Sequence, residues 1–108
     1  MAITYKILGQ AAPTLNTETV LYTATTQAIV SSITVANRSS TGIASFRVIV
    51  SQGGAATANA QYLYYDVKIG QNDTFIATVG LTLGVGDVIK VYASTSNLSF
   101  QAFGSEIS

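Results

Sequence analysis

Residues 81–104, LTLGVGDVIKVYASTSNLSFQAFG, contain the clearest secondary-structure signal in the chain. In residues 87–94 the apolar side chains Ile89, Val91 and Ala93 alternate with Val88, Lys90, Tyr92 and Ser94. In residues 97–103 the row Leu98, Phe100, Ala102 alternates in the same way with Ser99, Gln101 and Phe103. A period of two places each row on one face of a sheet and is incompatible with a helix. Residues 94–97, STSN, favour a turn. The stretch therefore predicts two β-strands joined as an antiparallel hairpin.

The rest of the chain repeats this pattern. Residues 18–24, 28–37, 44–51, 61–69 and 74–79 are further strand candidates, with turn residues between them and no segment of helical period. Seven to eight short strands at this spacing predict an all-β fold, an antiparallel β-sandwich or small jelly roll. We expect one such domain over residues 15–108.

The first 14 residues are interpreted differently. The β-like piece 3–8 is followed by a loop that ends at Pro13, the only proline, which lacks a backbone donor. This predicts an extended N-terminal arm over residues 1–14. Such an arm could pack on its own domain or pair with a neighbouring subunit.

Charge content is unusually low, with 9% Asp, Glu, Lys and Arg and a formal net charge of zero, against about 25% charged residues in ordinary soluble domains. Either the surface is rich in Ser and Thr around a monomer, or much of it contacts other subunits. The balanced charge argues against a nucleic-acid partner, and no apolar run is long enough to span a membrane. No export signal is recognisable at the N-terminus, so we expect synthesis in the cytoplasm.

Reactive groups are scarce. The chain has no cysteine and no histidine, which removes thiol nucleophiles, the commonest metal ligand and the usual base near neutral pH. Asp66 and Asp73 are the only carboxylates that we expect to approach one another, and turn-capping suits them better than catalysis. We therefore expect no enzymatic activity, no cofactor and no metal. Asp87, which opens a strand, is expected to accept bonds from nearby backbone N–H groups.

Two segments leave alternatives open. Residues 52–60, QGGAATANA, could be an exposed tip or a loop moulded against another protein. Tyr62, Tyr64 and Tyr65 could be ordinary strand residues, anchors of a protein interface, or a platform for sugar rings. Alternation places Tyr62 with Tyr64 on one face and Tyr65 on the other.

Three stretches carry a family resemblance: MAITYKILGQAAPT at residues 1–14, SSITVANRS at 31–39 and LTLGVGDVIKVYASTSNLSFQAFGSEI at 81–107. Together they resemble small virion structural proteins of tailed bacteriophages, cyanophages included. The resemblance implies a capsid cement, or decoration, protein: a small homo-oligomer, often a trimer, on the surface of the assembled head, where it bridges major capsid protein subunits.

On this reading the interface residues are Ile3, Tyr5, Ile7 and Leu8 of the arm together with Tyr62, Tyr64 and Tyr65. The alternatives are a neck, tail or tail-fibre component, and a carbohydrate-binding β-sandwich module.

Overall fold

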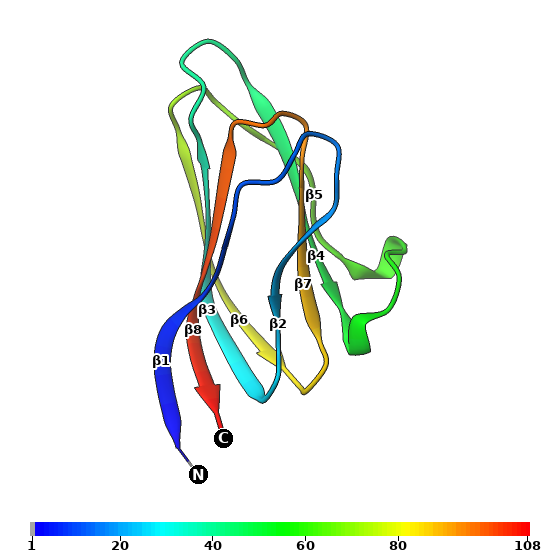
Figure 1. The fold of residues 1–108 in the computed structure, drawn as a ribbon. Helices are drawn as coiled ribbons and strands as arrows, with labels where there is room; N and C mark the ends of the chain where they lie inside the picture. The colour runs from blue at the N-terminus through cyan, green and yellow to red at the C-terminus, as the bar shows by residue number, and fades with distance from the viewer. Residues whose placement is uncertain (1) are drawn as a thin grey trace.

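A computed structural model describes residues 2–108 and contains two antiparallel four-stranded sheets packed face to face (Figure 1). Sheet A has the order β1-β8-β3-β6, and sheet B has the order β2-β7-β4-β5. The strands are β1 (Ile3–Ala11), β2 (Thr19–Thr23), β3 (Gln27–Asn37), β4 (Ala44–Ser51), β5 (Tyr62–Ile69), β6 (Thr74–Leu83), β7 (Val88–Ala93) and β8 (Leu98–Ile107). The predicted all-β sandwich of seven to eight strands is confirmed.

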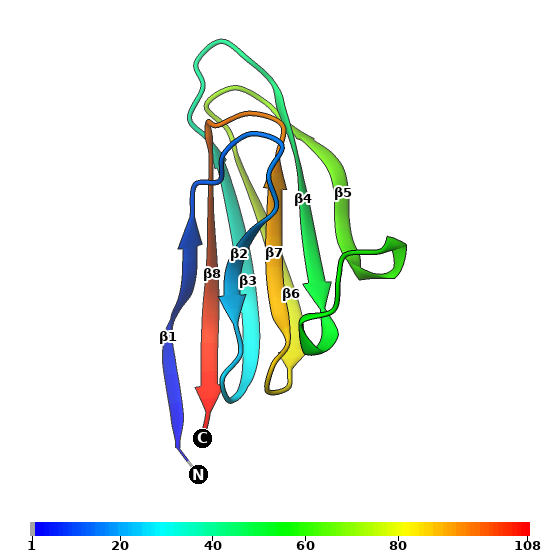
Figure 2. The same cartoon turned by 45° about the vertical axis from the view of Figure 1, so that its right-hand side comes forward.

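The strands of residues 81–104 form as predicted, but the predicted hairpin is wrong. β7 lies in sheet B and β8 in sheet A, so residues 94–97 cross from one sheet to the other (Figure 2). The apolar rows that include Val91 and Phe100 are both fully buried because they face each other across the core. Alternation specifies which face of a strand is buried, and two strands can bury their faces against each other as well as side by side.

The N-terminal segment forms an edge strand of sheet A. Ile3–Ala11 pairs antiparallel with β8 of the same chain, from Ile3 opposite Ile107 to Ala11 opposite Phe100. In Figures 1 and 2, β1 and β8 lie side by side, and the start of β1 lies beside the end of β8 at one end of the sandwich. The expected extended arm is not seen in the described residues, because β8 supplies a full-length partner within the domain.

Bulges interrupt sheet A at one level. Leu8 is the extra residue of β1 against β8, and Ser31 is the extra residue of β3 against the same strand. A bulge reverses the inward and outward alternation beyond it. Consequently Val30, not Ile29, lies in the core together with Ile33, which corrects the single alternation predicted for this strand.

Gly104 lies at the same level as these bulges and is required by the close approach of β3. A Cβ atom added at Gly104 would lie 2.0 Å from the carbonyl oxygen of Ile29. Glycine inside a strand commonly marks such a close backbone approach. The residue therefore allows β8 to pass β3 at the bulge.

The core lies between the sheets and is organised around aromatic rings. Phe46 of β4 packs against Phe75 and Phe100, with ring centroids 5.2 and 6.0 Å apart. Tyr64 joins the same cluster, 5.5 Å from Phe75 with the rings nearly perpendicular. Such tilted pairs are the favoured aromatic geometry. Sheet A and sheet B are thus joined by rings from both.

Asn37 is the buried polar group that ties the loops at one end of the sandwich. Its Nδ2 donates to the carbonyl oxygens of Gly42, Ile69 and Gly70 at 3.0, 3.3 and 3.2 Å, and its Oδ1 accepts from Ser39 N–H at 3.0 Å. A buried amide that is satisfied in this way holds several backbone segments at once. It fixes where β3 ends and where the next two loops pass.

Candidate functional site

The outer face of sheet A carries no charged side chain in the described residues. The strands β1, β3, β6 and β8 contain only two charged residues, Lys6 and Glu106. Both lie on the inward side of the sheet, because Lys6 pairs with Gly104 opposite buried Val30 and Glu106 pairs opposite buried Ala28. What remains outside is apolar, hydroxyl or amide. We call this surface the neutral face; its larger side chains are Ile3, Tyr5, Ile7, Ile29, Ile76, Gln101, Phe103 and Ile107.

Three of the predicted interface residues lie on this neutral face. Ile3, Tyr5 and Ile7 of β1 are 54%, 81% and 52% exposed, and the register with β8 places them beside Ile107, Ser105 and Phe103. Leu8 does not join them. It is the bulged residue of β1 and packs, partly buried, against the core. Leu8 is therefore separated from the other three residues predicted for the arm's interface.

Lys6 and Glu106 belong to a polar network that joins the two sheets. Lys6 Nζ lies 3.2 Å from Glu106 Oε1, and the Tyr22 hydroxyl of β2 donates to Glu106 Oε2 at 2.7 Å. Burial, followed by the bond to Glu106, raises the pKa of the Tyr22 hydroxyl. The Tyr22 and Lys6 bonds in turn lower the pKa of the Glu106 carboxyl. The charges of sheet A are thus paired within the chain.

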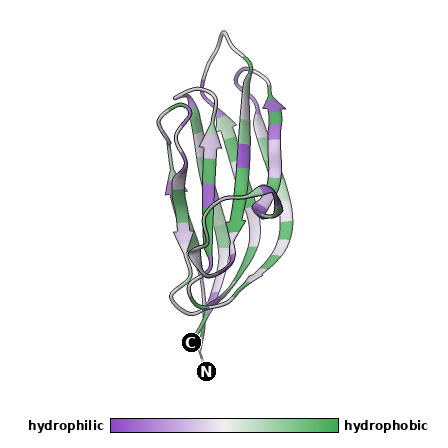
Figure 3. Cartoon of the chain, turned by 90° about the vertical axis from the view of Figure 1, so that its right-hand side faces the viewer, coloured by the Kyte–Doolittle hydropathy of each residue, from purple (hydrophilic) through white to green (hydrophobic). Residues whose placement is uncertain are grey.

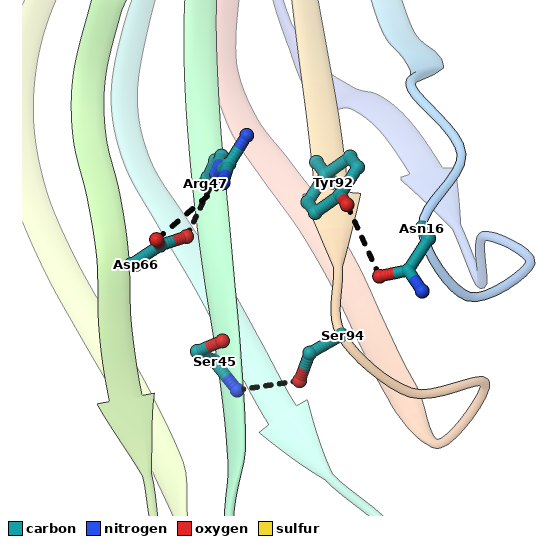
Figure 4. A network of polar contacts seen from close by, with 6 residues as sticks. All are labelled: Asn16, Ser45, Arg47, Asp66, Tyr92 and Ser94. Carbon is teal, nitrogen blue, oxygen red and sulfur yellow. Dashed lines mark hydrogen bonds and ion pairs between the residues drawn. The ribbon is translucent and has the colours of Figure 1, made fainter.

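The outer face of sheet B has a different character, because an arginine lies at its centre. The Arg47 guanidinium carbon lies 4.3 Å from the ring centroid of Tyr65 and 4.6 Å from that of Tyr92. Its Nε donates to Asp66 Oδ1 at 2.7 Å, and the Tyr92 hydroxyl donates to Asn16 Oδ1 at 3.0 Å (Figure 4). Cation–π contacts and a bidentate carboxylate hold the guanidinium in place.

Asp66 adopts a positive φ of 52° inside β5. Non-glycine residues adopt this region mainly in bulges and at special sites. The register between β4 and β5 shifts here, since Phe46 opposes Val67 while Val48 opposes Tyr64. The Arg47 hydrogen bond lowers the pKa of the Asp66 carboxyl. Asp66 is therefore an ion-pair partner, not the turn cap expected from sequence.

A second register shift, from Val48 opposite Tyr64 to Ile49 opposite Tyr62, redistributes the three tyrosines of β5. Tyr62 and Tyr65 lie together on the outer face, with ring centroids 4.8 Å apart at 88°, whereas Tyr64 points into the core aromatic cluster. The predicted placement of Tyr62 and Tyr64 on one face was wrong, because Tyr64 packs, partly buried, against the core. Tyr62, Tyr65 and Asn59 line an open hollow of about 350 Å³.

Residues 52–61, the loop between β4 and β5, are largely exposed but bonded to their own sheet. Lys90 Nζ donates to the Ala55 carbonyl at 3.1 Å, and the Thr57 hydroxyl donates to Glu18 Oε1 at 2.8 Å. Figure 3 shows the loop crossing in front of sheet B. Ile49 points outward with Arg47, as alternation predicts, yet it is fully buried. The predicted exposed tip is therefore tethered to the domain.

Asp87 fixes the other end of this region. Its Oδ1 accepts from Gly53 N–H at 2.8 Å and its Oδ2 accepts from Gly84 N–H at 2.9 Å. These two bonds, the Gly53 bond first, lower the pKa of the Asp87 carboxyl. The expectation that Asp87 binds backbone N–H groups is confirmed. Sequence could predict the bond within the turn, but not the one that reaches Gly53.

Residues 2–108 contain no group of three or more Asp, Glu, His or Cys side chains placed to hold a metal ion. Within the same range, no helix is long and apolar enough to cross a membrane. Compared with protein-family models, curated proteins and solved structures, the chain shows no significant match. In the part of the chain that the structure describes, the neutral face and the hollow at Tyr62 and Tyr65 are two surface features from which a function can be argued.

Proposed function

We propose that the protein is a structural component of a bacteriophage virion, a capsid cement protein that associates with copies of itself and with the major capsid protein on the head surface. The neutral face is the observation that carries this proposal. A surface without charge loses little hydration free energy when another protein covers it, because no ion must be desolvated. The sequence resemblance to phage virion proteins supports placing the protein in a phage particle.

The size of the neutral face fits such a contact. Four strands spaced about 4.8 Å apart and about ten residues long span roughly 600 Å². Each partner of a standard protein interface buries about 800 Å². The face therefore supplies most of one interface, and the flanking loops can supply the rest. A protein that binds only the assembled shell stabilises it by mass action.

The proposal is tested by placing one charge on the neutral face. Ile76→Lys changes an exposed residue of this face, and Val85→Lys changes an equally exposed residue in a loop outside both sheets. Binding is measured by co-sedimentation with expanded heads from phage particles that lack this protein. We expect Ile76→Lys to weaken binding at least about tenfold, since burying an unpaired ammonium costs more than about 1.4 kcal/mol, and Val85→Lys to leave it unchanged.

Two results would count against cement. Equal binding by both variants would remove the neutral face from the contact. Immunogold labelling of virions at the neck or tail, with heads unlabelled, would move the protein to another part of the particle.

The hollow lined by Asn59, Tyr62 and Tyr65 favours one other function, carbohydrate binding. Exposed aromatic rings stack on sugar rings, and the Asn59 amide can bond hydroxyl groups. A glycan array probed with the wild type and with Tyr65→Ala decides this. Hits that disappear in the variant support a sugar-binding module, whereas an array without hits rejects it.

A further inference from the structure

The free edge of β1 has a defined set of outward-pointing backbone groups. Ala2 N–H donates to Ser108 O at 2.8 Å and Ser108 N–H donates to Ala2 O at 2.9 Å, so these two residues form a hydrogen-bonded pair. In an antiparallel ladder such pairs alternate with pairs that are not hydrogen-bonded. The backbone N–H and C=O groups of Thr4 and Lys6 therefore bond to the residues opposite them in β8, Glu106 and Gly104. The N–H and C=O groups of Ile3, Tyr5 and Ile7 point away from it.

This edge has only limited protection against pairing. Residues 2–7 are all exposed. The segment contains no proline, and its one charge, on Lys6, is bonded to Glu106 of the same chain. Natural proteins normally protect long apolar edges with charges, prolines or bulges. The bulge at Leu8 comes only after Ile7, so Ile3–Ile7 remains an open edge of continuous register.

We infer that β1 of a second copy of this chain occupies this edge, antiparallel to the first, around a two-fold axis at Tyr5. Opposite residues in a sheet share a face, and a two-fold axis perpendicular to the sheet keeps every residue on its own face. One residue of the strand must therefore lie opposite its own copy, with the axis midway between the two. With the axis at Tyr5, Ile3 of each copy lies opposite Ile7 of the other, which gives two pairs. Tyr5 lies opposite its counterpart and gives the third. These three pairs exchange about six backbone hydrogen bonds.

The neighbouring registers are worse. An axis at Lys6 places two ammonium groups directly opposite each other, which is destabilising. An axis at Thr4 uses only the pairs of Ile3 with Tyr5, about four hydrogen bonds within Ile3–Ile7. The Tyr5 register places each Lys6 opposite a Thr4 hydroxyl. It therefore satisfies most edge groups without opposing like charges.

Pairing of this kind joins the two sheets A into one sheet of eight strands, and the two neutral faces become one continuous surface. The inference rests on the proposed function, because it identifies the contact by which two copies of the proposed cement protein associate. A two-fold edge contact closes at two copies. The pairing thus specifies a dimer in place of the trimer that the family resemblance implies.

The first test removes one outward donor. Tyr5→Pro deletes an N–H that makes no bond to β8, so the ladder within the chain is kept, whereas Tyr5→Ala keeps the N–H and removes only the side chain. Native mass spectrometry at micromolar concentration measures the oligomer, and circular dichroism checks the fold. We expect a wild-type dimer, a dimer of Tyr5→Ala, and dimerisation of Tyr5→Pro weakened at least about 100-fold.

The second test fixes the register by disulfide formation in a chain without cysteine. Tyr5→Cys places two Cα atoms about 5.5 Å apart across the axis, within the range that a disulfide bridges. Thr4→Cys places them about 8 Å apart in the same register, which is too far. Oxidation should cross-link Tyr5→Cys alone. Cross-linking of Thr4→Cys instead, or a wild-type monomer or trimer, would overturn the inference.

Head binding keeps this inference separate from the proposed function. A wild-type monomer that coats heads overturns the edge pairing alone. A wild-type dimer that ignores heads supports the pairing and overturns the cement function. Truncation of the first ten residues is a poorer test than Tyr5→Pro, because it also strips β8 of its partner.

Discussion

Replacing Asn37 tests whether one buried amide holds the loops at one end of the sandwich. The side chain is 2% exposed and takes part in four hydrogen bonds, three donated and one accepted. In Asn37→Ala, the Ile69 carbonyl loses a partner in a buried setting, and the part-buried groups can be partly rehydrated. An unsatisfied buried polar group costs about 1–3 kcal/mol, so we expect a total loss of about 2–4 kcal/mol. In a domain of this size that lowers Tm by about 10–20 °C.

Asn37→Asp adds a pH signature to the same test. A carboxylate in this position would face carbonyl oxygens, and burial and repulsion would raise its pKa above that of an unfolded Asp. The group then destabilises the fold at neutral pH, and stability returns as the pH falls through the raised folded pKa and the carboxyl is protonated.

Urea unfolding followed by circular dichroism between pH 3 and 7 measures both variants. Asn59→Asp, on the exposed loop, is the control and should show no such recovery at low pH. A loss below about 0.5 kcal/mol in Asn37→Ala, within the range of ordinary surface substitutions, would refute the reasoning.

Three further predictions concern single side chains. The Ser51 hydroxyl is fully buried without a hydrogen-bond partner, so Ser51→Ala should leave the urea midpoint unchanged or raise stability by up to about 1 kcal/mol; a loss larger than that would mean that the hydroxyl is satisfied. Gly104→Ala should cost more than about 3 kcal/mol or prevent folding, because its Cβ would overlap the Ile29 carbonyl, while Gly80→Ala, with open space around it, should be tolerated; equal Tm values for the two would contradict the bulge geometry. The pKa of the Asp87 carboxyl is lowered in the folded protein, so the stabilisation by Asp87 is complete above about pH 4 and is lost as the pH falls through the lower folded pKa. Asp87→Asn should therefore reduce the fall in the free energy of unfolding at acid pH. An unchanged fall would contradict this prediction.

The strands could be predicted from sequence because alternation is a local property. Each predicted strand over residues 18–103 is present, and rows such as Ile89, Val91 and Ala93 are buried as expected. The partner of each strand is set by packing between distant segments. Among the strands of residues 2–108, only β4 and β5 are both consecutive and paired. Periodicity does not distinguish such a pair from two strands that face each other across the core.

The candidate surfaces could be predicted only in part. Ile3, Tyr5 and Ile7 follow from simple alternation, whereas Leu8 and Tyr64 turn inward at bulges that polar and apolar patterning does not reveal. Glycine inside a strand is the one available signal, and Gly104 marks that level of sheet A. Nothing comparable announces Asp66, whose positive φ depends on the register between β4 and β5. The neutral face itself could be found only after the strands were assigned to sheets.

The place of β8 in sheet A has a kinetic consequence. This strand, the last in chain order, lies between β1 and β3, so neither can complete its ladder until residues 98–107 have left the ribosome. Folds dominated by such distant pairings typically acquire their structure in milliseconds to seconds. During that interval the open edge of β1 can pair with other nascent copies. A low local concentration of nascent chains should therefore favour pairing of β1 with its own β8 over aggregation.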